Sequence, residues 1–196
     1  MTRRSRQYPI TLNLEQLKCV VVGTGTVGER KAVRLTNAGT TPLLIGTRVT
    51  SLIQDLALAG KVRLHKTQYR PELLAGATLV FAATSNVALN ARIARDARSV
   101  GALINLTDNP ASSDFFNVSD VTSGDVQISV STGGRSPAFA RALRKRLQTL
   151  LPIDLGGQLA HFERWREEVE ARFPLPEVRQ RVWDELDRRD IYSALE

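Results

Sequence analysis

The chain of 196 residues has one cysteine, few aromatic residues and no long apolar run. Its single cysteine, Cys19, cannot form an intrachain disulfide, which favours a reducing compartment such as the cytoplasm, and we expect it to be a small buried residue. No segment approaches the roughly 20 apolar residues of a membrane-spanning helix. The basic start, residues 1–6, is not followed by the apolar stretch of a signal peptide. We therefore expect an untargeted, soluble chain with no membrane partner.

The charge is positive and unevenly distributed. The net charge is +7, and residues 1–113 carry 15 Lys/Arg against 6 Asp/Glu, whereas residues 161–196 carry 7 against 10. Such a field favours an anionic ligand, which could be a dinucleotide, a polycarboxylate or nucleic acid. Aromatic residues make up only 6% of the chain and form no stacking platform, so nucleic acid is not the expected partner.

Three glycines follow the apolar run 17–22 in the spacing G-x-G-x-x-G: they are Gly23, Gly25 and Gly28. In dinucleotide-binding folds the first permits a tight turn, the second lets a pyrophosphate approach the backbone, and the third lets the next helix pack closely. The helix N-terminus then faces the ligand's negative charge. The motif alone is weak, because any tight turn can use glycine. The buried-strand pattern before it and the helical pattern after it strengthen the interpretation.

Residues 17–106 alternate between short apolar runs and helix-like segments. We predict strands over 18–22, 41–45, 62–66, 78–83 and 102–106, and helices over 27–37, 49–59 and 87–100. This alternation indicates a parallel sheet with helices on both faces and a ligand crevice at the carboxyl ends of the strands. Four polar or glycine-rich segments fall at those ends: 23–28, 46–48, 84–86 and 105–108.

The second predicted strand ends without the acidic residue that usually binds the adenosine ribose, because Gly46-Thr47-Arg48 stands there. Arg48 could pair with a 2′-phosphate, which favours NADP, or lie over the adenine while Thr47 binds the ribose. It could equally be a solvated residue before a helix. The residues themselves leave the choice between NAD and NADP open.

Asp108 follows the last strand of this series, at the level where a nicotinamide and its substrate would meet. A lone carboxylate there is a candidate general base. It is also a candidate turn residue before Asn109-Pro110, and position alone favours the turn. The two histidines, His65 and His161, lack partners at metal-ligand spacing, so we predict no metal site.

A different pattern begins near residue 113. A turn at 123–125 precedes an alternating strand over 126–130, and Ser136-Pro137 begins a helix that runs to about residue 151, with a capping residue before a proline. Further helices are predicted over 158–171 and 176–189. Their apolar positions are Phe162, Trp165, Val169, Val178, Val182 and Leu186.

Several segments together resemble the siroheme synthase dehydrogenase module, the family of precorrin-2 dehydrogenase and sirohydrochlorin ferrochelatase. They are residues 23–31, 82–84, 105–108, 129–137 and 136–144. The likeness runs from about Tyr8 to about Pro152, and more loosely through the helical tail. Two positions depart from the family pattern: Phe-x-x-Pro is common where this chain has residues 115–118, and alanine is common at Gly28.

The resemblance implies an α/β fold in three parts: an NAD-binding Rossmann domain over 1–113, a dimerisation region over 114–147 and a helical domain over 148–196. It implies a homodimer that oxidises precorrin-2 to sirohydrochlorin with NAD. In bifunctional members ferrous iron is a further substrate, and no motif shows whether this chain belongs to them. A non-catalytic dinucleotide-sensing module and a basic nucleic-acid-binding protein are the rival interpretations.

The resemblance also assigns residues. Thr26, Val27, Thr47 and Arg48 would contact the cofactor, and Asp108 matches the catalytic aspartate. Gly23, Gly25, Gly28 and Thr84 complete the expected cofactor set. We further expect Arg135 and the helix start at Ser136 to hold substrate carboxylates, with an exposed charge and a helix N-cap as the alternative. Thr132, which stands where some members have serine, is a third candidate for substrate binding.

Overall fold

The computed structural model describes residues 7–188, of which 186–188 by their backbone alone, and it divides the chain into two compact units, 1–117 and 118–196. The first unit contains a parallel sheet of order β3-β2-β1-β4-β5. Its strands are β1 (Cys19–Val22), β2 (Leu43–Ile45), β3 (Arg63–His65), β4 (Leu79–Ala82) and β5 (Leu103–Leu106). This order and direction confirm the predicted Rossmann sheet.

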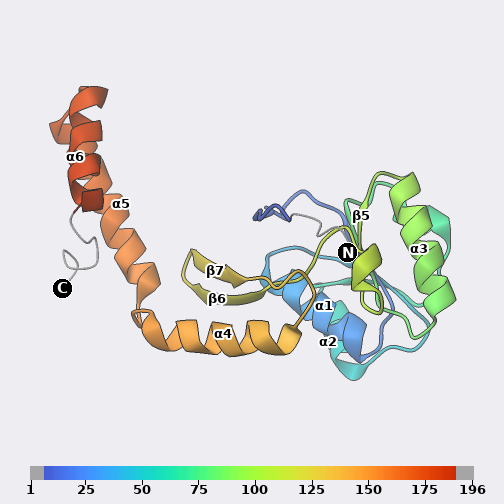
Figure 1. The fold of residues 1–196 in the computed structure, drawn as a ribbon. Coiled ribbons are helices and arrows are strands. Elements are labelled where there is room, and N and C mark those ends of the chain that lie inside the picture. The colour runs from blue at the N-terminus through green and yellow to red at the C-terminus, as the bar shows by residue number, and fades with distance from the viewer. Residues whose placement is uncertain (1–6, 189–196) are drawn as a thin grey trace. The chain divides into compact units, whose positions relative to one another are not determined.

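Helices cover both faces of this sheet, so the three central strands β2, β1 and β4 are buried throughout, with successive residues packed on opposite faces. On one face Val21 and its neighbours pack against α1 (Thr26–Asn37) and α2 (Ser51–Leu58). On the other face Val20 and Val22 pack against α3 (Val87–Ser99) and the 3-10 turn η1 (Pro71–Leu74). Figure 1 shows α1 and α2 together, with α3 on the other side of the strands. Cys19 is buried as expected, and burial raises the pKa of its thiol.

The observed strands are one to two residues shorter than the predicted ones, and two short elements were not predicted. These are η1, in the crossover between β3 and β4, and the 3-10 turn η2 (Pro110–Ser112) after β5. Each begins at a proline, which has the fixed φ that a first helical turn requires. Elements of three or four residues are too short to show a helical period in the sequence.

The second unit begins with an antiparallel hairpin of β6 (Ser119–Ser123) and β7 (Val126–Val130). Gly124 adopts a φ of 55° in the two-residue turn, as tight hairpins require. The turn and β7 confirm the prediction, whereas β6 was not predicted. α4 (Pro137–Leu150) follows, capped by the Ser136 hydroxyl, which accepts a hydrogen bond from the Phe139 N–H at 3.2 Å.

Two long helices complete the second unit: α5 (Leu155–Arg172) and α6 (Pro176–Arg188). They lie side by side (Figure 1) and contact through aromatic rings, since Trp165 of α5 meets Trp183 of α6 edge-on, with 5.3 Å between the ring centres. Phe162, also on α5, meets Trp165 edge-on with 6.3 Å between the ring centres. The predicted helix end at residue 189, the side chain of Leu186 and the basic residues 1–6 lie outside the described part. The subdivision into regions 114–147 and 148–196 stays a prediction.

Candidate functional site

A cavity of about 640 Å³ opens at the carboxyl ends of the parallel strands, in the size range of ligand sites, roughly 300–1,000 Å³. The chain segments that follow β1, β2, β3 and β4, together with Thr107 after β5, line it. The lining residues are Val22, Gly23, Thr24, Gly25, Thr26, Val27, Ile45, Gly46, Thr47, Arg48, Thr67, Gln68, Tyr69, Ala83, Thr84, Ser85, Asn86, Leu89, Arg92 and Thr107. The cavity therefore lies at the crevice that the strand alternation predicts.

Gly23 and Gly28 are required by the protein itself. Gly23 has a φ of 115°, and a Cβ there would overlap the backbone oxygen of Ala83. A Cβ at Gly28 would overlap the carbonyl oxygen of Gly23, at the closest approach of α1 to β1. Both glycines thus have the packing roles predicted from their spacing, and Gly28 lies behind the cavity wall rather than in it.

Gly25 differs, because nothing in the protein requires a glycine there. Its φ of −83° suits any residue, and a Cβ would have no atom within 4 Å. As the N-cap of α1 it offers no side chain to the first N–H groups of the helix, which lie beside the cavity with Thr26 and Val27. Open space above a glycine beside free helical N–H groups fits the pyrophosphate of a dinucleotide.

The end of β2 is tied to the glycine turn through Thr24. This buried residue donates a hydrogen bond from its hydroxyl to the carbonyl oxygen of Arg48 at 2.5 Å, and a Cβ at Gly46 would overlap the same hydroxyl. Thr47 and Arg48 consequently line the cavity with exposed side chains. The part of the cavity next to β2, where the adenosine of a dinucleotide is expected, therefore offers the hydroxyl of Thr47 and the cation of Arg48 instead of a carboxylate.

Asp108 is joined to the cavity wall by one buried amide that sequence reasoning missed. Its carboxylate accepts a hydrogen bond at 2.9 Å from the side-chain nitrogen of Asn90, a residue of α3 that is 1% exposed. The same amide bonds Thr84, which lines the cavity, while Asp108 itself is exposed. The side-chain amide of Asn90 thus bonds both the predicted base Asp108 and the predicted cofactor residue Thr84.

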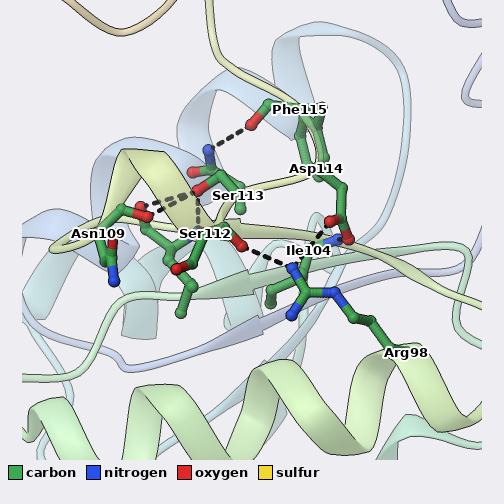
Figure 2. Close-up of polar contacts among 9 residues, drawn as sticks. Arg98, Ile104, Asn109, Ser112, Ser113, Asp114 and Phe115 are labelled. Carbon is green, nitrogen blue, oxygen red and sulfur yellow. Dashed lines mark hydrogen bonds and ion pairs between the residues drawn. The ribbon is translucent and has the colours of Figure 1, made fainter. Parts of the chain in front are cut away.

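The loop that carries Asp108 is closed at its base by side chains (Figure 2). The Ser113 hydroxyl accepts a hydrogen bond from the Leu106 N–H at 2.9 Å, and the Asp114 carboxylate accepts one from the Ile104 N–H at 3.1 Å. Arg98 of α3 pairs with Asp114 at 2.8 Å and also donates to the Ser112 carbonyl. These contacts hold both ends of segment 107–112 on β5, so Asp108 sits on a short, anchored loop.

Two further cavity residues, Tyr69 and Arg92, were not predicted. Tyr69 follows β3, the edge strand, whose end carries no glycine or acidic signal, and Arg92 lies on α3, within a helical pattern. Tyr69 lines the cavity and donates a hydrogen bond from its hydroxyl to Asp96 at 2.9 Å. Burial and that hydrogen bond raise the pKa of Tyr69. Arg92 lines the cavity too, and its guanidinium lies 3.6 Å from the carboxylate of Asp96.

Lys31 of α1 lies half-buried on the face of the sheet that α1 and α2 cover. Its ammonium donates to the side-chain oxygens of Asn105, at 3.2 Å, and Asn117, at 2.7 Å, and it lies 5.4 Å from the centre of the Phe81 ring. Burial, followed by the charges of nearby arginines, lowers the pKa of Lys31 to about 8. Asn117 falls within residues 115–118, where the chain departs from the family's Phe-x-x-Pro.

The predicted substrate residues form a cluster of their own in the second unit. The hydroxyl of Thr132 accepts a hydrogen bond from the Ser136 N–H at 3.2 Å, and Ser136 caps α4. Gly133 and Gly134 between them have φ values of 61° and 72°. Ser136 thus has the capping role, and Arg135 the exposed position, that were weighed above as the alternative. A role of Thr132, Arg135 and Ser136 in substrate binding stays a prediction.

Neither histidine belongs to a metal cluster within residues 7–188. His65 ends the edge strand β3 and His161 lies on α5, both exposed. In this part of the chain no group of three His, Cys, Asp or Glu side chains could hold a metal ion. None of the helices described there is long and apolar enough to cross a membrane.

Comparisons with known proteins agree with this geometry. Residues 10–119 match the family described as putative NAD(P)-binding, and residues 123–150 match the family described as sirohaem biosynthesis protein central. A siroheme synthase of Chromobacterium violaceum is 34% identical over 96% of the chain and 40% of its own length. A siroheme synthase of Nitrosospira multiformis is 36% identical over 91% of the chain and 39% of its own length.

The solved structure titled SirC, precorrin-2 dehydrogenase, has a similar fold, with a TM-score of 0.74 at 17% identity over 92% of this chain and 89% of its own. The chain spans about two fifths of the length of the curated relatives it matches. The sequence match covers the glycine turn and the whole cavity-forming unit, where the parallel sheet places its dinucleotide crevice. The chain therefore belongs to the NAD(P)-binding family that its motifs resemble, the siroheme synthase N-terminal module.

Proposed function

We propose that this protein oxidises precorrin-2 to sirohydrochlorin with NAD as the hydride acceptor, in the cytoplasm. The observation that carries the proposal is the carboxylate of Asp108, held by a buried amide next to a dinucleotide-sized cavity whose glycine turn is open to a pyrophosphate. The names of its relatives and of its structural neighbour agree with this substrate. A polycarboxylate substrate also suits the excess of cations in residues 1–113.

The oxidation removes one hydride and one proton from the reduced tetrapyrrole. The oxidised nicotinamide ring, when bound, supplies the hydride acceptor. Asp108 takes the proton as general base, a step that requires its carboxylate to be ionised. The first N–H groups of α1, at Thr26 and Val27, hold the pyrophosphate, while Thr47 and Arg48 contact the adenosine end. With Thr84 beside them, these residues form the proposed cofactor set.

The second unit supplies the proposed substrate carboxylate holders and the dimer contact. Arg135 is an exposed cation beside a helix N-terminus, which suits a carboxylate. The helix α4 exposes Phe139 and Leu143, one helical turn apart, as well as Leu150. Exposed apolar residues on one helix favour association, so the homodimer is proposed to form through residues 114–147, which include Phe139 and Leu143.

The test is anaerobic incubation of the purified protein with precorrin-2 and NAD, following NADH and the sirohydrochlorin spectrum. Asp108→Asn should lower turnover about 10²- to 10⁴-fold, the range for loss of a general base, while NAD binding stays within about twofold. Asp55→Asn, at an exposed carboxylate on α2, is the matched control and should keep full activity. Unchanged turnover by Asp108→Asn would remove the base assignment.

The same assay separates the rival interpretations. A dinucleotide-sensing module would bind NAD but oxidise no precorrin-2, with or without Asp108. A nucleic-acid-binding protein would retard DNA at low salt, with an affinity that falls steeply as salt rises. Addition of ferrous iron after oxidation tests chelation, since insertion faster than the spontaneous rate would make the protein bifunctional.

A further inference from the structure

The side chain of Asn90 uses all of its hydrogen-bonding capacity on two partners. Its oxygen accepts from the Thr84 hydroxyl at 2.7 Å and from the Thr84 N–H at 3.3 Å. Its nitrogen donates to the Thr84 carbonyl at 3.0 Å and to the Asp108 carboxylate at 2.9 Å. An amide has two acceptor sites and two donor hydrogens, so no valence is left unused.

These partners fix which way the amide faces. In the reversed orientation the side-chain nitrogen would meet the Thr84 N–H, and the oxygen would meet the Asp108 carboxylate, so both contacts would be repulsive. The residue is also 1% exposed and its neighbours on α3 are apolar, which keeps water from replacing a lost partner. The donor therefore points at Asp108 in one defined direction.

Holding the Thr84 segment would not require a contact with Asp108. Three of the four bonds tie Asn90 to Thr84, six residues before it, at the end of β4. The fourth reaches a carboxylate eighteen residues away, on the loop anchored to the neighbouring strand β5. Because a hydrogen bond to an ionised acceptor is stronger than a neutral one, this contact holds the Asp108 carboxylate in the fixed orientation that a general base needs.

We propose that Asn90 is a positioning residue that fixes the Asp108 carboxylate relative to Thr84 and thereby to the wall of the dinucleotide cavity. This inference rests on the proposed function, in which Asp108 is the base. Asn90 lies beneath the cavity surface and does not line it, whereas Thr84 does. It therefore acts through Asp108 and not on the ligands themselves.

Asn90→Asp is the sharpest test, because it keeps the shape and the acceptor but removes both donor hydrogens. Turnover should fall about tenfold to a hundredfold, as expected for a misplaced catalytic group, while NAD affinity stays within about threefold. The acid side of the pH–rate profile should move to higher pH, because two adjacent carboxylates share a proton more readily than a carboxylate beside an amide. A role limited to folding would not move that profile.

Asn90→Ser serves as the second variant, since it is small and neutral and too short to span both partners. It should lower turnover to a similar degree without moving the pH profile. A third measurement needs no turnover: the side-chain amide proton resonance of Asn90 in the wild-type protein should shift when Asp108 is replaced by asparagine and stay unchanged in the Asp55→Asn control.

The outcomes are distinct. If either Asn90 variant folds, keeps its turnover within twofold of wild type and has an unchanged pH profile, positioning by Asn90 is refuted. This holds even if Asp108→Asn is inactive. If Asp108→Asn remains active, the base assignment fails and the positioning role fails with it, whatever the amide resonance does. If the side-chain amide resonance of Asn90 does not shift in Asp108→Asn, the contact between the two side chains is absent, which also overturns the proposal.

Discussion

The buried ammonium of Lys31 should make the stability of the protein depend on pH, in the direction opposite to that of a lysine in an ion pair. Burial lowers the pKa of its ammonium from 10.5 to about 8. Below pH 8 the group is charged in both the folded and the unfolded protein. Between pH 8 and 10.5 the unfolded chain binds more protons than the folded one, so the free energy of unfolding should rise with pH across this window.

The magnitude follows from the two pKa values. Each unit of difference corresponds to about 1.4 kcal/mol, and between pH 7 and 9.5 the linkage relation gives a rise of about 2 kcal/mol. Lys31 is only half-buried, so solvent screening reduces this figure. We expect a contribution of about 1–2 kcal/mol from this one group.

The comparison is with Lys31→Arg, which can still donate to Asn105 and Asn117 but stays protonated throughout the window. Urea unfolding of both proteins at pH 7.0, 8.0, 9.0 and 9.5 gives the difference in their free energies of unfolding. Other titratable groups, such as Tyr69, contribute equally to the two proteins, so their effects cancel in the difference. The wild type should gain stability relative to Lys31→Arg as the pH rises, and a difference that stays constant within about 0.5 kcal/mol would refute a buried, easily deprotonated lysine.

Two pairs of substitutions separate the roles of single positions in the site. Gly25→Ala should leave the free energy of unfolding in urea within about 0.5 kcal/mol of wild type but weaken NAD binding at least tenfold, because its Cβ meets no protein atom and enters the space for the pyrophosphate. Gly28→Ala should instead lower the free energy of unfolding by about 1–3 kcal/mol, because its Cβ overlaps the Gly23 carbonyl. Equal effects of the two substitutions would contradict this division. Ser113→Ala should cost about 1–2 kcal/mol in urea unfolding by removing the acceptor of the Leu106 N–H, and should also slow precorrin-2 oxidation, since the loop carrying Asp108 loses its anchor. Ser112→Ala is its control, because Ser112 contacts Arg98 through a backbone oxygen, and similar behaviour of the two serine variants would show that the loop is held in another way.

The sequence predicted the sheet and the cavity well because both depend on strong local signals. Buried parallel strands are continuous apolar runs, and the carboxyl ends of such strands meet at one edge of the sheet. The sequence alone therefore predicts that segments 23–28, 46–48 and 84–86 lie close together. Segment 67–69 was missed because β3 is the edge strand, with Arg63 and His65 exposed, and its end carries no glycine.

The contacts of Asp108 could not be predicted, for a different reason. Asn90 lies within a helical pattern, where an asparagine is most often an exposed residue, and only the packing of α3 on β4 and β5 brings it beside Asp108. The same holds for Ser113 and Asp114, whose side chains bond the backbone of a strand that precedes them. Long-range hydrogen bonds of this kind have no periodic signature in the sequence.

The anchoring of residues 113 and 114 on β5 has a consequence for behaviour in concentrated solution. β5 is the last strand of the sheet, and an unpaired strand edge is a template to which other chains can add. Here the Leu106 and Ile104 N–H groups are already bonded by Ser113 and Asp114, and the opposite edge, β3, carries the exposed side chains of Arg63 and His65. The segment that anchors the Asp108 loop thus also occupies the N–H groups of this sheet edge, which hinders the addition of a strand from another chain. Resistance to aggregation and placement of the proposed base therefore depend on the same contacts.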